Sequence, residues 1–117
     1  MAFKDKKSIV KYDDFQKIEI LAGTIKTAEL NKKATKPAYV LSIDFGPDRG
    51  IKISSAQITN YSIDELINRQ IVAVCNFKNR NIAGIESEVL VLGAINEKEE
   101  VILLEPRQSV NNGSEIA

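Results

Sequence analysis

The sequence has no histidine, no tryptophan and only one cysteine among its 117 residues. Without histidine it cannot form a Ser-His-Asp triad, a Cys-His pair, an imidazole base or a histidine-ligated metal site. A single cysteine excludes an intrachain disulfide, a CxxC redox pair and a cysteine-based zinc site. These absences predict a binding protein that is not an enzyme and that uses no metal and no cofactor.

Long hydrophobic runs are also absent. No apolar stretch approaches the roughly 20 residues of a membrane span, and residues 1–11 are too charged for a signal peptide. We therefore expect a cytoplasmic protein without membrane insertion. The length predicts one domain over residues 1–117, because domains of about 100–150 residues are the commonest. We expect residues 1–11 to be a disordered arm.

The formal net charge is zero, but the two signs are unevenly spread along the chain. Residues 1–40 carry nine Lys and five acidic residues, and residues 41–80 carry five bases and four acids. Residues 81–117 carry two bases and seven acids. We interpret the neutrality as the sum of a basic face and an acidic remainder, which predicts weak, salt-sensitive RNA binding. Random scatter of surface charge is the alternative.

Hydrophobic periodicity predicts an all-β protein. Alternating or continuous apolar runs indicate strands over residues 18–30, 38–45, 51–55, 71–77, 88–95 and 101–104. Gly23 lies inside the first run and predicts a bulge or a sharp bend. Residues 12–15 read as a single helical turn, with Asp13 or Asp14 as its cap and Phe15 packed inward. Residues 79–84 read as a polar loop.

One short helix is predicted between the third and fourth strands. Ser62 and Glu65 form a capping box, which indicates a helix over residues 63–68. Five strands in a Greek-key barrel, with a small helix between strands 3 and 4, is the OB-fold arrangement. N- and C-terminal segments would flank this barrel. An open antiparallel sandwich is the alternative, but a bend at Gly23 favours closure.

Basic and small polar residues gather in the predicted loops and in the second and third strands. Such residues can contact phosphates, base edges and the 2′-hydroxyl group, and OB-folds bind oligonucleotides on this face. Aromatic residues make up only 6% of the chain, so few rings are free for base stacking. Cys75 lies in an apolar run with no obvious cation nearby, and we expect it to be unreactive.

Several motifs resemble those of one family. The residues are Lys36-Pro37-Ala38-Tyr39, Ser54-Ser55-Ala56-Gln57-Ile58, Asn76-x-x-x-Arg80 and Ser87-Glu88. Together they resemble CsaA-type proteins, a branch of the tRNA-binding domains found on methionyl- and phenylalanyl-tRNA synthetases. The resemblance runs from about Tyr12 to the C-terminus.

This resemblance implies an OB-fold homodimer that binds tRNA. It also implies an export-related chaperone, which holds unfolded preproteins for the secretion machinery. Chaperoning with no physiological RNA role is the alternative. Carried over to matching positions, the tRNA surface comprises Lys33, Lys36, Lys52, Ser54, Gln57, Asn76, Lys78, Arg80 and Ser87. Asn79 and Asn81 stand where relatives often have Pro and a second base, which predicts weaker RNA binding.

The segments outside the barrel are candidates for a dimer interface. A closed barrel is complete by itself, so these segments need another purpose, and a monomer would leave their apolar side chains exposed. The predicted interface residues are Tyr12, Phe15, Ile102, Leu104 and Val110.

Overall fold

The computed structural model describes residues 6–117 and contains two short helices and nine strands in that part of the chain. The helices are α1 (Tyr12–Gln16) and α2 (Ile63–Leu66). The strands are β1 (Ile20–Leu30), β2 (Tyr39–Asp44), β3 (Ile51–Ala56), β4 (Gln70–Val74), β5 (Arg80–Ile82), β6 (Ile85–Ser87), β7 (Leu90–Val91), β8 (Gly93–Ile95) and β9 (Val101–Leu103). Neither helix is long and apolar enough to cross a membrane.

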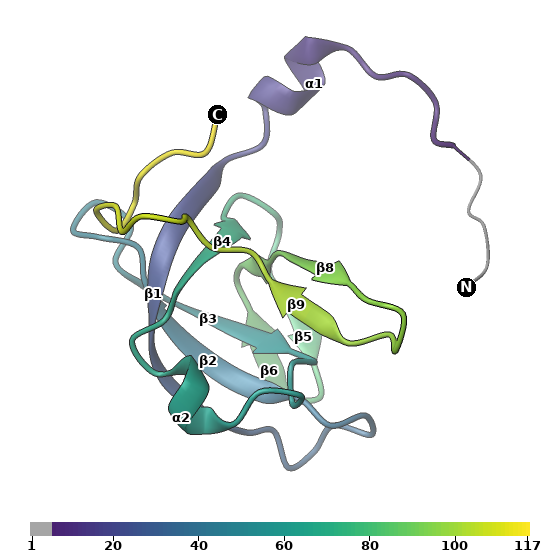
Figure 1. Cartoon of the computed structure of the whole chain (residues 1–117), viewed down its shortest axis with the longest axis vertical. Coiled ribbons are helices and arrows are strands. Elements are labelled where there is room, and N and C mark those ends of the chain that lie inside the picture. Colours follow the sequence, from purple (N-terminus) through teal and green to yellow (C-terminus); the bar gives the residue numbers. More distant parts are fainter. Residues whose placement is uncertain (1–5) are drawn as a thin grey trace.

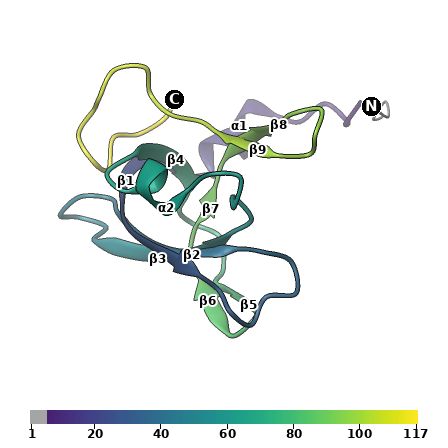
Figure 2. The same ribbon diagram turned by 60° about the horizontal axis from the view of Figure 1, so that its bottom comes forward.

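Five antiparallel strands form a nearly closed barrel in the order β3-β2-β1-β4-β7 (Figures 1 and 2). The long strand β1 pairs with β4 through its first half and with β2 through its second half. The barrel closes where β3 meets residues 87–89, and there Glu88 N donates a hydrogen bond to Ile53 O over 2.8 Å. With α2 between β3 and β4, this is the predicted OB-fold barrel.

The irregularity in β1 lies beyond the predicted position. The register shifts between Ile25 and Thr27, whereas Gly23 pairs regularly with Ile71. Gly23 is required for a different reason: a Cβ there would lie 2.7 Å from the Phe45 ring and 2.9 Å from Ile43. Of the two predicted alternatives, a bulge at Gly23 is therefore wrong, while a sharp bend there stays a prediction. The glycine lets the buried Phe45 ring pack on β1.

The barrel interior is filled by aliphatic side chains together with Phe45 and Tyr39. The largest fully buried side chains include Ile25, Leu41, Ile43, Phe45, Ile58, Leu66 and Ile71. The capping box at α2 is confirmed, since Glu65 N donates to Ser62 Oγ over 3.2 Å and Ser62 N donates to Glu65 Oε1 over 2.9 Å. The helix ends at Leu66, two residues earlier than predicted, and Leu66 lies in the core.

The chain after β4 differs from the prediction. Residues 80–87 form a hairpin, β5–β6, where a loop was expected over 79–84, and Cys75 to Phe77 lie outside β4. The single strand predicted over 88–95 is divided: β7 pairs with β4, and β8 pairs with β9. In Figure 2 the β5–β6 hairpin lies at the bottom of the view and the β8–β9 pair at the top.

The two terminal segments behave differently. Helix α1 projects from the barrel and buries none of its residues (Figure 1). Its N-cap is Lys11, not Asp13 or Asp14, and Phe15 is 40% exposed, not packed inward. The C-terminal tail is attached to β1, since Ala22 N donates to Ser114 O and Ile116 N donates to Ile20 O, both over 2.9 Å.

The predicted disorder over residues 1–11 falls partly outside the described residues. Residues 1–5 lie outside them, and residues 6–11 are exposed and precede α1 without helix or strand.

Candidate nucleic-acid interface

One face of the barrel brings together β3, the loop at residues 31–37 and the β5–β6 hairpin. It contains two neighbouring depressions that share Ser55 and Ile82. The first depression is also lined by Phe77, Lys78, Arg80, Ser87, Glu88, Val89 and Leu90. The second is also lined by Ala34, Thr35, Lys36, Ala38, Gln57 and Ala83. Five of the nine predicted tRNA contacts therefore converge here: Lys36, Gln57, Lys78, Arg80 and Ser87.

Asn31 holds the basic loop against the hairpin. Its buried side chain donates to Ile82 O over 3.4 Å, and its Oδ1 accepts from Lys33 N over 3.2 Å. Lys33 consequently lies over the hairpin turn, with its Cδ 3.5 Å from the position of a Cβ at Gly84. Asn31 is not among the site residues predicted from the sequence. The sequence signal for its role is an asparagine between the end of the first predicted strand and Lys32-Lys33.

Four cations on this face have no acidic partner among residues 6–117. Lys33, Lys36, Lys78 and Arg80, which we call the basic rim, form no ion pair within 4.0 Å among the described residues. Lys52, a fifth predicted cation, pairs with Glu88 over 3.9 Å. Unpaired cations around a shallow surface attract phosphate groups.

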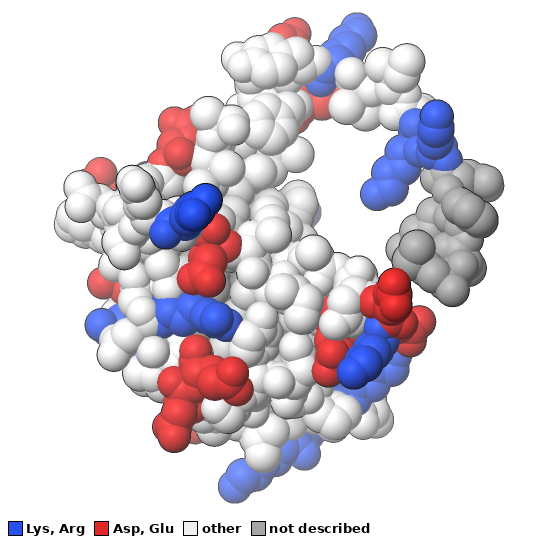
Figure 3. Space-filling model, in the orientation of Figure 1, with Lys and Arg blue, Asp and Glu red and all other residues white. Residues whose placement is uncertain are grey.

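Acidic side chains also lie close to the basic rim. Glu88 lines the first depression, and Glu99 and Glu100 share a third depression with Lys36. Figure 3 shows acidic and basic side chains side by side over the visible face, with basic ones at its lowest edge. These carboxylates reduce the positive potential at the basic rim.

Two predicted tRNA contacts are part of the barrel closure. Ser54 is 1% exposed and donates to Val89 O over 3.1 Å. Ser87 is 7% exposed, and its Oγ accepts from Ser55 N over 3.1 Å. Glu88 Oε1 accepts from Ile53 N over 2.9 Å. These side chains hold β3 against residues 87–89, and we call this group of contacts the closing seam.

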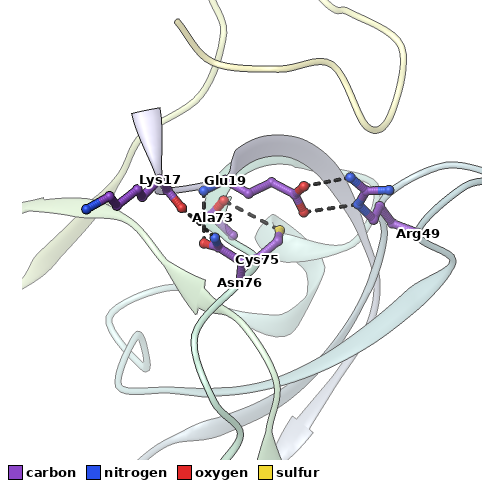
Figure 4. A network of polar contacts seen from close by, with 6 residues as sticks. All are labelled: Lys17, Glu19, Arg49, Ala73, Cys75 and Asn76. Carbon is purple, nitrogen blue, oxygen red and sulfur yellow. Dashed lines mark hydrogen bonds and ion pairs between the residues drawn. The ribbon is translucent and has the colours of Figure 1, made fainter. Parts of the chain in front are cut away.

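Asn76, another predicted tRNA contact, lines neither depression. Its Oδ1 accepts from Glu19 N over 2.9 Å and its Nδ2 donates to Lys17 O over 2.7 Å (Figure 4). The side chain thereby fixes the segment between α1 and β1. Beside it, Arg49 donates two hydrogen bonds to the Glu19 carboxylate over 3.0 and 2.6 Å. The hydrogen bond from Arg49 lowers the pKa of Glu19.

The thiol of Cys75 is not activated as a nucleophile. Burial, reinforced by the nearby Glu19 charge, raises the pKa of Cys75 to about 11. A thiol with a raised pKa is a poor nucleophile at neutral pH. Among residues 6–117 no group of three His, Cys, Asp or Glu side chains could hold a metal ion. The face instead offers the four unpaired cations of the basic rim, which can attract anions.

One protein-family model matches most of the barrel and the C-terminal tail. The family model described as "Putative tRNA binding domain" matches residues 20–115. The chain therefore belongs to the tRNA-binding-domain family.

Two solved structures are similar over nearly the whole chain. The CsaA chaperone protein from Picrophilus torridus is 52% identical, with a TM-score of 0.89, and the match covers 93% of this chain and 100% of that one. The chaperone CsaA from Bacillus anthracis is 45% identical, with a TM-score of 0.89 and coverage of 94% and 100%. The resemblance to CsaA-type proteins is confirmed.

Among curated sequences the similar proteins are far longer. The methionine–tRNA ligase of Methanococcus aeolicus is 36% identical over 112 residues, which is 96% of this chain but 16% of the ligase. The chain thus spans about one-sixth of the length of such relatives.

Proposed function

We propose that this chain is a non-catalytic, cytoplasmic tRNA-binding protein of the CsaA type. The observation that carries the proposal is the basic rim, whose four cations have no acidic partners among the described residues. Lys36, Lys78 and Arg80 line the two depressions, and Lys33 lies over the neighbouring hairpin turn. Membership of the tRNA-binding-domain family supports tRNA as the polyanion. The phosphate backbone would supply most of the affinity, because the rim cations displace its counterions.

Titration of the protein with tRNA tests this proposal. We expect Arg80→Ala to weaken binding, whereas Arg107→Ala, the same change in the exposed C-terminal tail, leaves it unchanged. Equal effects of the two variants would assign binding to overall charge and contradict a site at the rim. Absence of any tRNA binding at low salt would contradict the function itself.

We also propose that two copies associate through the terminal segments. The five predicted interface residues are all exposed: Tyr12 by 72%, Phe15 by 40%, Ile102 by 43%, Leu104 by 45% and Val110 by 41%. The Tyr12 and Phe15 rings contact each other, with centroids 6.5 Å apart, on a helix that buries none of its residues in the described chain. Exposed apolar groups in this number favour a partner surface.

Light scattering tests the association. We expect a mass near twice 13.0 kDa, and Phe15→Asp should reduce it to that of a monomer. Ile51→Asp is the matched control, because it replaces an apolar side chain on β3 that is 61% exposed by the same charged one. It should leave the mass unchanged. A monomeric wild-type protein would contradict the proposal.

The second candidate function is an export-related chaperone that holds unfolded preproteins for the secretion machinery. The identities of 52% and 45% to two CsaA chaperones favour it, and it is compatible with RNA binding on a separate surface. A denatured enzyme diluted from guanidinium tests it. Stoichiometric protein should suppress aggregation of the enzyme, and suppression without any tRNA binding would favour the chaperone alone.

A further inference from the structure

The first depression contains an exposed aromatic ring. Phe77 follows β4 and is 50% exposed, although its place in an apolar run predicted a strand position. It lines the depression together with Ile82 and Leu90, and Leu90 is itself 46% exposed. The ring therefore stands beside an apolar wall at the surface, directly before Lys78 in the chain.

The size of the depression limits what can occupy it. Its volume is about 90 Å³, well below the roughly 300–1,000 Å³ of pockets that enclose a whole drug-sized ligand. It can receive one ring-sized group, with the rest of the ligand remaining outside. This excludes an enclosed cofactor and favours one unit of a longer chain.

The polar groups around the ring specify the chemistry of that unit. Lys78 and Arg80 line the depression without acidic partners within 4.0 Å among residues 6–117. Ser55 also lines it, and the Ser55 Oγ is buried without a hydrogen-bond partner in the same part of the chain. A buried hydroxyl without a partner is costly, and a polar ligand atom would relieve that cost.

A nucleotide matches the exposed ring, the two cations and the Ser55 hydroxyl at once. Its base is flat and stacks on an aromatic ring, its phosphate pairs with the cations, and its polar atoms can reach a hydroxyl. An apolar peptide side chain would use the ring and the wall but leave the two cations and the hydroxyl unsatisfied. A base within a duplex presents no free face, so the base must be unpaired.

We propose that the first depression is a stacking site for one unpaired nucleobase, with Phe77 as the platform and Lys78 and Arg80 as contacts to the adjoining phosphates. The inference rests on the proposed RNA-binding function. It adds recognition of an unstacked nucleotide to attraction of the backbone. The basic rim then acts on any RNA, whereas the ring selects RNA that offers a free base.

Because the sequence contains no tryptophan, Phe77→Trp places a single tryptophan at the platform. The probes are an RNA of six uridines and a matched strand of six abasic sites with the same number of phosphates. Stacking should quench the tryptophan with the uridine strand and not with the abasic strand.

A second variant measures the affinity. Phe77→Leu keeps an apolar side chain but removes the ring, and should weaken binding of the uridine strand about tenfold, in the range of base stacking on aromatic residues. Its binding of the abasic strand should not change. Ile51→Ala, which removes apolar surface elsewhere, should bind both strands as the wild type does.

The other outcomes overturn the inference in distinguishable ways. If Phe77→Leu binds both strands as well as wild type while Arg80→Ala still weakens tRNA binding, the stacking site is wrong and the tRNA-binding function stands. If wild type binds neither strand nor tRNA, both are wrong. Quenching of the tryptophan variant by an unfolded apolar peptide but not by RNA would assign the depression to peptide.

Discussion

At the scale of single residues, the same residue types serve structure and binding, and only three-dimensional context separates them. Ser54 and Ser87 resembled RNA contacts in the sequence, yet both are buried in the closing seam. Their hydrogen-bond partners, Val89 and Ser55, lie more than thirty residues away in the sequence, so no local pattern indicates these bonds. By contrast, the capping box of Ser62 and Glu65 was predictable because its partners are three residues apart.

Cys75 provides a residue-scale prediction about pH. With a pKa of about 11, the thiol carries little thiolate at pH 8, where an ordinary thiol of pKa near 8.5 is about one-quarter ionised. Alkylation by iodoacetamide at pH 8, followed by mass spectrometry, should be at least about tenfold slower in the folded protein than in guanidinium. The folded rate should rise towards pH 11. Equal rates in both states at pH 8 would contradict the raised pKa.

At the scale of elements, the pieces that surround the site were the hardest to predict. The β5–β6 hairpin reads as polar loop because its strands bury little, and its position depends on the distant contact from Asn31 to Ile82 O. The run at 88–95 looked continuous, but its two halves pair with different strands, β4 and β9. Barrel strands with alternating burial, such as β2, were predicted correctly.

Glu88 tests the closing seam. Glu88→Ala removes the acceptor of the hydrogen bond from Ile53 N, and should lower the free energy of unfolding by about 1–3 kcal/mol. Glu88→Gln retains an acceptor oxygen and loses mainly the pairing with Lys52, which is partly exposed and contributes little. In urea unfolding, the free energy of unfolding of Glu88→Gln should therefore be near that of the wild type. That of Glu88→Ala should be well below it. Equal losses in the two variants would show that the charge, not the hydrogen bond, closes the barrel.

Asn76 tests how α1 is held. Asn76→Ala removes the hydrogen bonds to Glu19 N and Lys17 O, so hydrogen exchange at the Glu19 amide should accelerate about tenfold, corresponding to about 1.4 kcal/mol. Asn79→Ala is the matched control, since that side chain has no hydrogen bond among the described residues. If Asn76 contacts tRNA and does not hold α1, Asn76→Ala should instead weaken tRNA binding and leave hydrogen exchange at the Glu19 amide unchanged.

At the scale of the whole molecule, a net charge of zero does not decide the partner. The molecule extends over 40 × 39 × 29 Å, whereas charges are screened beyond about 10 Å at 0.1 M salt. Distant acidic residues of the C-terminal third therefore contribute little to the potential at the basic rim under physiological conditions. The local charges do matter, and Glu88, Glu99 and Glu100 beside the rim limit its attraction for phosphate.

Binding through the basic rim predicts how the affinity for tRNA depends on salt concentration. If the four rim cations each neutralise one phosphate, the logarithm of the tRNA association constant should fall with the logarithm of salt concentration with a slope of about −3. Affinity would then fall roughly 60-fold between 50 and 200 mM salt. Lys36→Ala should reduce the slope by about 1, and Arg107→Ala should leave it unchanged.

The low-salt limit separates local from global electrostatics. Near 0.01 M salt the screening length reaches about 30 Å, so the acidic remainder acts across the molecule and opposes tRNA. Fluorescence titration should therefore show a shallower slope below about 0.02 M than above 0.1 M. A single straight line with unchanged slope in Lys36→Ala would mean that the rim does not contact phosphate, and that tRNA binds elsewhere on the protein.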